Sequence, residues 1–101
     1  MTESGGVRAN LLVLYCVNLE ECRQFYADLG LGFTAEQHGK GPRHYAAILA
    51  DGVVFELYPA GPGCETGLLR LGLTLASAEG LTPGRHLLTD PDGRVVEVHA
   101  T

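Results

Sequence analysis

The stretch DPDGRVVEVHA (residues 90–100) closely parallels an earlier one, ADGVVFELYPA (residues 50–60). In both, an Asp-Gly pair precedes a short apolar run that a single glutamate interrupts. Alignment pairs Asp51 with Asp92, Gly52 with Gly93, Glu56 with Glu97 and Tyr58 with His99. Because Asp-Gly between apolar runs is a strong turn signal, each stretch predicts a turn followed by a strand. The chain therefore carries the same strand twice, each time with a carboxylate among apolar side chains.

The residues before the first copy complete a β-α-β-β-β pattern. NLLVLYCV (10–17) is short and rich in β-forming residues, which favours a buried strand. Apolar residues at helical spacing predict a helix over about 19–29 that ends at Gly30, with Asn18 as N-cap and Glu21 as its capping-box partner. Three strands separated by turns follow, at 33–38, 43–50 and 53–58.

The second half repeats this order in a shortened form. LLRLGLTLA (68–76) alternates in the manner of a strand, and RHLLT (85–89) and RVVEVHA (94–100) flank a DPDG turn. SAEGLTPG (77–84) is too short and too rich in Gly and Pro for a helix. The second copy is therefore expected to lack its helix.

Length and composition limit the classes of protein that fit. The chain has 101 residues, 46% of them hydrophobic, and a net charge of −5, which indicates one domain with a core and argues against a nucleic-acid surface. No apolar run approaches the ~20 residues of a membrane span. The polar start predicts no signal peptide, and three cysteines without CxxC spacing favour reduced thiols, two of them buried, in a cytoplasmic protein.

Strand alternation places both glutamates on the face away from the helix. Glu56 shares a face with Tyr58, and Glu97 shares one with His99, while the purely apolar residues between them point the other way. The helix must bury its apolar stripe against the apolar face. We therefore expect the polar side chains, joined by Arg70, to line a concave ligand cavity.

Other roles for these residues remain open. A glutamate on one face of an antiparallel sheet is often merely solvated. Arg70 could form an ion pair with Glu56 or Glu97, or it could await an anionic ligand. Tyr15 and Tyr58 could stack on a flat ligand or belong to the core.

Three motifs resemble the vicinal oxygen chelate superfamily, which includes glyoxalase I, extradiol dioxygenases and bleomycin-resistance proteins. VNLEECRQFYADLGLGF (17–33) is similar to the signature of that family's first helix, and VVFELYP (53–59) and DPDGRVVEVHA (90–100) are similar to its fourth and last strands. The resemblance implies an α+β fold with two βαβββ-type modules forming a curved mixed sheet around a cavity. The single domain would comprise module one at about 9–59, a linker at about 60–67 and a shortened module two at about 68–101.

In metal-dependent members of that family, the first and last strands of each half commonly supply two His and two Glu. The last-strand positions here hold Glu56 and Glu97, whereas the first-strand positions fall near Leu11 and Arg70. Leucine has no donor atom, and a guanidinium repels a cation. The resemblance therefore implies the metal-free branch, in which a homodimer binds a small organic molecule, such as a drug or metabolite, without a cofactor.

The expected ligand-binding residues are Glu56, Arg70, Glu97, His99, Tyr58 and Tyr15. The alternative is a metal-dependent lyase, isomerase or dioxygenase. In that case Glu56, Glu97, His99 and His44 would compose an irregular metal site with nitrogen and oxygen donors. A metal-free enzyme that uses a cavity glutamate as general base is a further possibility.

Overall fold

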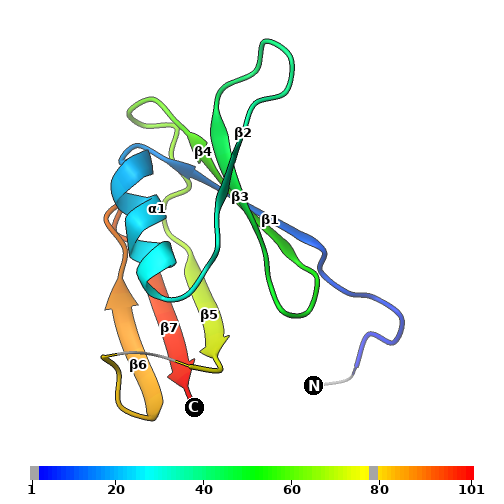
Figure 1. Cartoon of the computed structure of the whole chain (residues 1–101), viewed down its shortest axis with the longest axis vertical. Coiled ribbons are helices and arrows are strands. Elements are labelled where there is room, and N and C mark those ends of the chain that lie inside the picture. Colours follow the sequence, from blue (N-terminus) through cyan, green and yellow to red (C-terminus); the bar gives the residue numbers. More distant parts are fainter. Residues whose placement is uncertain (1–2, 78–79) are drawn as a thin grey trace.

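A computed structural model of the chain describes residues 3–77 and 80–101. It contains one helix and seven strands, in an α+β arrangement (Figure 1). In chain order they are β1 (Leu11–Cys16), α1 (Leu19–Asp28), β2 (Thr34–Glu36), β3 (His44–Ile48), β4 (Val54–Pro59), β5 (Arg70–Leu75), β6 (Gly84–Thr89) and β7 (Val95–Ala100). Each expected strand and the expected helix is present, with ends that differ by no more than two residues.

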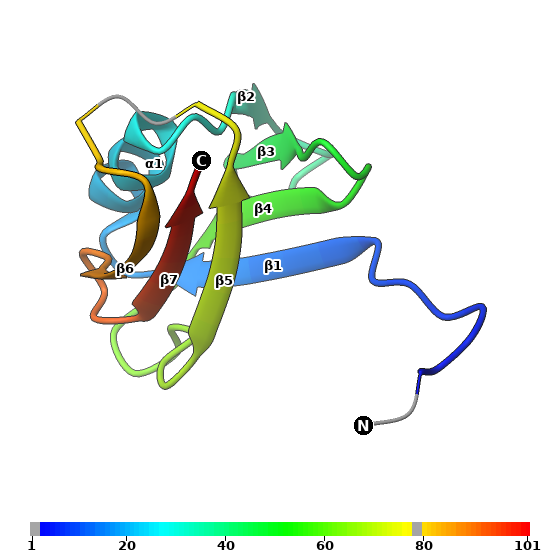
Figure 2. The ribbon, with the colours of Figure 1, turned by 90° about the horizontal axis from the view of Figure 1, so that it is seen from below.

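The strands form two small sheets with the same internal plan. The first has the order β1-β4-β3-β2 and the second has the order β5-β7-β6. In each sheet the first strand of the module runs parallel to the last one, and the remaining pairs are antiparallel. Figure 2 shows the two sheets steeply inclined to one another. The predicted duplication is confirmed, and the second copy lacks counterparts of α1 and β2.

The loop predicted at 77–84 joins β5 to β6. Residues 78 and 79 lie outside the described residues, and the described part of this loop contains no helix. Across the described ranges no helix is long and apolar enough to cross a membrane.

The core lies between α1 and the apolar faces of both sheets. Phe55 and Leu57 from β4 and Val96 and Val98 from β7 are all fully buried. Burial of each such side chain contributes about 1.5–3 kcal/mol. Helix α1 packs against β1 and β4, and its Tyr26 side chain reaches Asp90 in the β6–β7 turn. The face that carries the two glutamates points away from the core, as the alternation predicted.

The predicted capping box at the start of α1 is absent. Asn18 makes no side-chain bond to the helix; its side-chain amide instead donates to Asp92 in the β6–β7 turn at 3.0 Å. The same Asp92 carboxylate accepts the backbone N–H groups of Val17 (2.8 Å) and Asn18 (3.0 Å). A carboxylate from the other module thus satisfies donors just before the helix, where the positive end of its dipole favours an anion.

Candidate functional site

The two glutamates occupy equivalent places in the two sheets. Glu56 lies opposite Val13 of β1, and Glu97 lies opposite Gly72 of β5. These first-strand neighbours are two residues further along than Leu11 and Arg70, the positions expected from the sequence. Neither valine nor glycine has a donor atom in its side chain, so the first strands supply no metal ligand directly opposite either glutamate.

Glu97 is surrounded by cationic groups of the protein itself. Its carboxylate accepts hydrogen bonds from Arg85 (Nε, 2.8 Å) and Arg70 (3.2 Å), and His99 Nε2 lies 3.0 Å away. The hydrogen bond with His99, followed by that from Arg85, lowers the pKa of Glu97 to about 2. Arg70 thus forms the ion pair that was one of its two expected roles. Arg85 was not expected in the site, although alternation along β6 places it beside His99.

Glu56 has quite different neighbours. Its carboxylate lies 3.5 Å from Nε2 of His44, a side chain that is only 1% exposed. The same nitrogen lies 3.4 Å from Glu36 Oε1, and Nε2 of His38 lies 3.6 Å from that oxygen. Tyr58 stacks on the His44 ring, with centroids 4.1 Å apart and planes 10° apart. Two histidines and two glutamates therefore gather at one end of the first sheet.

The four residues proposed from the sequence as an irregular metal site divide between these two clusters. Glu97 and His99 pair with each other and with arginines, whereas His44 and Glu56 face Glu36. Sequence reasoning passed over Glu36 and did not include His38 among the candidate ligands. The available signal in the sequence was an acid and a histidine two residues apart, in EQH (36–38). In the structure Glu36 pairs with His44 of β3.

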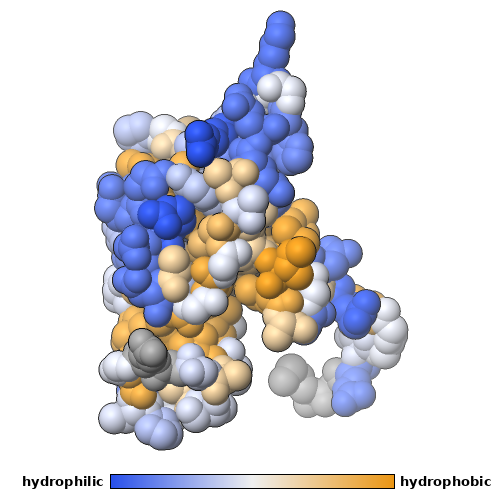
Figure 3. All heavy atoms as spheres, viewed as in Figure 1, coloured by the Kyte–Doolittle hydropathy of each residue, from blue (hydrophilic) through white to orange (hydrophobic). Residues whose placement is uncertain are grey.

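A separate hollow of about 790 Å³ lies between the β3–β4 hairpin, the end of α1 and the free edge of β5. Its apolar lining residues include Leu31, Ile48, Leu49, Leu73 and Leu75. In Figure 3 apolar residues lie on both sides of the notch in this part of the surface. None of the six ligand-binding residues expected from the sequence lines this hollow, although Gly72 and Thr74, which do, share a strand face with Arg70.

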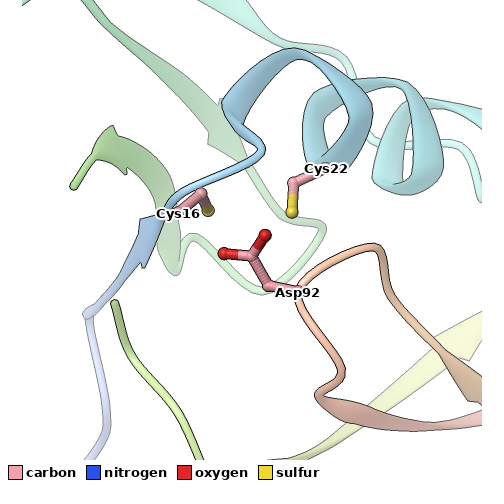
Figure 4. Close-up of side chains that lie close together, drawn as sticks. All are labelled: Cys16, Cys22 and Asp92. Atoms are coloured by element: carbon pink, nitrogen blue, oxygen red, sulfur yellow. The ribbon is translucent and has the colours of Figure 1, made fainter. Parts of the chain in front are cut away.

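A second cluster joins the two modules beside the start of α1. Cys16, Cys22 and Asp92 have donor atoms within 4.8 Å of one another and point toward a common centre (Figure 4). The guanidinium of Arg94 donates to Cys16 Sγ at 3.2 Å and to Cys22 Sγ at 3.5 Å. Since a buried guanidinium already occupies this space, a cation would be repelled there, and the cluster has a structural role.

Arg94 is the centre of that structural role. It is 1% exposed, and it donates to Asp90 at 2.7 Å and to the backbone carbonyls of Tyr15 (3.2 Å) and Thr66 (2.7 Å). The hydroxyl of Tyr26, in α1, donates to the same Asp90 carboxylate at 2.7 Å. Burial, and then the hydrogen bond to Asp90, raise the pKa of Tyr26. A buried ion pair thus connects β1, α1 and the linker to the β6–β7 turn.

Three solved structures share the architecture over almost the whole chain. TnmS3, an antibiotic binding protein from Streptomyces sp. CB03234, has a TM-score of 0.64 and 19% identity over 97% of this chain and 98% of its own. A lactoylglutathione lyase from Agrobacterium tumefaciens has a TM-score of 0.60 and 16% identity over 92% of each chain. The oxidase ChaP-H2 has a TM-score of 0.59 and 14% identity, over 95% of this chain and 94% of its own.

No protein-family model and no curated protein matches the sequence. The similarity to the three solved structures therefore concerns the fold. All three have vicinal oxygen chelate-like folds, and this chain has that fold with a reduced second module.

Proposed function

We propose that this protein binds a small organic molecule, such as a drug or metabolite, and that binding requires no metal ion or other cofactor. The observation that carries the proposal is the hollow of about 790 Å³, whose lining includes five leucines and one isoleucine. Ligand pockets are typically apolar clefts of about 300–1,000 Å³ with a few polar groups at their margins. TnmS3, which has the same fold, is an antibiotic binding protein.

Polar contacts at the margin would come from the residues singled out in the sequence. Arg70, Glu97 and His99 lie on the same face of the second sheet as Gly72, which lines the hollow. On the first sheet, Glu56, Tyr58 and Tyr15 share the face of Ile48, another lining residue. Arginine guanidinium groups bind carboxylate and phosphate through charge-assisted, often bidentate hydrogen bonds, so Arg70 would suit an anionic group of the ligand.

We also propose that the protein is a homodimer. Within the described residues, β1 pairs only with β4 and β5 pairs only with β7, so each sheet has one of these strands at its edge. Leu11 is 54% exposed, Tyr15 46% and Ile48 78%. A second copy would cover the unpaired edges and this apolar surface. The three free thiols support a cytoplasmic location. Sedimentation at increasing concentration should find a dimer, and a persistent monomer would contradict this part of the proposal.

The alternative, a metal-dependent lyase, isomerase or dioxygenase, has less support. The metal sites implied by the superfamily resemblance would need ligands on the first strands opposite Glu56 and Glu97, and those positions hold Val13 and Gly72. The cations around Glu97 would also compete with a metal for its carboxylate. Ligand binding that persists in EDTA favours the binding protein, whereas binding or turnover that strictly requires a metal favours the enzyme.

The test blocks the hollow without disturbing the fold. A Cβ added at Gly72 would meet nothing within 4 Å, so Gly72→Phe should fill the hollow while β5 stays intact. Gly67→Phe, at another glycine with open space, is the matched control. Thermal-shift and calorimetric screening against glycopeptide drugs and aromatic metabolites should identify a ligand whose binding is lost in Gly72→Phe and retained in Gly67→Phe. Equal binding by both variants would refute the location of the site.

A further inference from the structure

We propose that Glu36, His38, His44 and Glu56 form a binding site for one divalent transition-metal ion, with Zn²⁺ as the representative. These residues come from β2, the β2–β3 loop, β3 and β4. Only Glu56 coincides with a metal position implied by the superfamily resemblance. None of the four residues lines the larger hollow, although Glu56 is also proposed at its margin, and the metal site is argued without the organic ligand.

His44 carries the main observation for a bound cation, because one of its ring nitrogens is buried without a hydrogen-bond partner among the described residues. Its Nδ1 lies 3.1 Å from the carbonyl oxygen of Pro42. Because a carbonyl can only accept a hydrogen bond, Nδ1 carries the proton, and in the neutral ring Nε2 presents a lone pair. Nε2 is buried and has no hydrogen-bond partner among the described residues. Leaving a buried polar atom unsatisfied costs about 1–3 kcal/mol, so a role for this lone pair is expected.

That lone pair faces two carboxylates, an arrangement that a neutral imidazole does not favour. Glu36 Oε1 lies 3.4 Å from Nε2, and Glu56 Oε2 lies 3.5 Å from it. A charge-assisted hydrogen bond would bring nitrogen and oxygen to about 2.7–2.9 Å. The lone pair of His44 Nε2 and the two carboxylate oxygens beside it are all electron-pair donors, and such a group of donors is what a metal cation requires.

The spacing of the donors fits tetrahedral coordination. Donor atoms that each lie about 2.0–2.2 Å from a tetrahedral Zn²⁺ are separated from one another by about 3.4 Å. The observed separations are 3.4 and 3.5 Å around His44, and 3.6 Å between His38 and Glu36. The donor atoms of Glu36, His38 and His44 all lie within 4.8 Å of one another, and Glu56 joins this group through its oxygen 3.5 Å from His44 Nε2.

The surroundings hold the buried ligand in place and leave space beside it. The Pro42 carbonyl fixes the tautomer of His44, and the stacked ring of Tyr58 fixes its plane. Such outer contacts orient metal-bound histidines in general. A hollow of about 400 Å³, lined in part by Glu36 and Ala46, adjoins the site. Two imidazoles and two carboxylates make a mixed nitrogen and oxygen set that suits Zn²⁺, Ni²⁺ or Fe²⁺.

The test measures metal binding directly, with no organic ligand present. Full-length protein carrying Cys64→Ser, which removes the exposed thiol, is stripped with EDTA, dialysed and titrated with Zn²⁺. We expect one ion per chain by calorimetry and elemental analysis, together with a rise in Tm, because an ion that binds only the folded state stabilises it. Co²⁺ should give the visible absorption of a tetrahedral site.

Variants identify the ligands. Glu36→Gln and His38→Ala, at partly or well exposed side chains, should each weaken Zn²⁺ binding about tenfold or more while the circular dichroism spectrum stays unchanged. His44→Gln should abolish Zn²⁺ binding. If that buried variant does not fold, Glu36→Gln and His38→Ala still test the proposal. His86→Gln and Glu21→Gln are matched controls outside the cluster, and their affinity should equal that of the parent.

Two results would overturn the proposal. One is a parent protein that binds no Zn²⁺ and whose His44 ring is doubly protonated at neutral pH by NMR, as an imidazolium paired with both carboxylates would be. The other is Zn²⁺ binding that Glu36→Gln and His38→Ala leave unchanged. Neither result bears on the proposed organic ligand, whose binding is measured in EDTA.

Discussion

Glu56 and Glu97 hold the same position in the two copies of the repeat, and their surroundings are opposite in character. Glu97 is held by Arg70, Arg85 and His99, and its charge is neutralised by the protein itself. Glu56 lies beside the buried His44, and a second carboxylate, that of Glu36, lies beside the same ring nitrogen. One copy therefore surrounds its glutamate with arginines, and the other places its glutamate beside imidazole and a second carboxylate.

The turns that precede the two glutamates differ in the same way. Asp51 accepts one local N–H, that of Val53, at 3.2 Å. Asp92 accepts three donors from the other module, and the residue two positions on is the buried Arg94. The two copies thus share a backbone pattern, but it is the turn of the second copy, at Asp92, that connects the two modules.

The largest expected effect comes from removing that connection. Arg94→Met leaves the Asp90 carboxylate buried without its cation, and we expect a loss of about 3–5 kcal/mol in the free energy of unfolding. Val53 is the equivalent residue in the first copy and is only partly buried. Val53→Met should cost less than about 1.5 kcal/mol. Urea unfolding of both variants measures the difference, and similar losses would show that the two turns are equivalent.

A smaller contrast is expected at the turn aspartates. Asp92→Ala removes the acceptor of three N–H donors beside the helix and should cost about 1–2 kcal/mol, whereas Asp51→Ala should cost a few tenths.

Acidification provides an independent check on Asp92. Burial alone would raise the pKa of this carboxyl, but hydrogen bonds from Asn18 and Val17 outweigh it and hold the pKa below its usual 3.8. A depressed folded-state pKa means that the carboxylate stabilises the fold fully above pH 3.8 and less as pH falls further. The difference between wild type and Asp92→Ala should therefore shrink below pH 3.8, and a constant difference would contradict the assignment.

The smallest effect concerns the cations around Glu97. Its pKa of about 2 should rise toward the usual 4.5 in His99→Asn and in Arg85→Met, because each variant removes a hydrogen bond to the ionised form. Carboxyl ¹³C NMR titration measures this directly. Stability should change little, since exposed ion pairs contribute about 0–1 kcal/mol and are screened by salt. His86→Asn is the control and should leave the pKa of Glu97 unchanged. If His99→Asn and Arg85→Met also leave that pKa unchanged, the contrast between Glu97 and Glu56 is wrong.

Much of the fold followed from local signals. The helix was predicted from the spacing of apolar residues such as Cys22 and Tyr26, both of which are buried. The faces of β4 and β7 followed from the period-two alternation that every strand imposes. The repeat was visible because Asp-Gly turns and interrupted apolar runs are short-range patterns. Local rules failed at Asn18, where the expected capping box gave way to a bond with Asp92 in the other module.

Sequence alone thus determined the order of the elements, their faces and the equivalence of Glu56 with Glu97. Tertiary structure decided what surrounds each acid. Arg94 contacts Tyr15 across 79 positions of the chain, and the His44 ring is buried between Tyr58 and Glu36 by the pairing of three strands. Periodicity in the sequence reports which way a side chain points relative to its own backbone. The charges around a side chain and its degree of burial depend on segments that only the folded chain brings together.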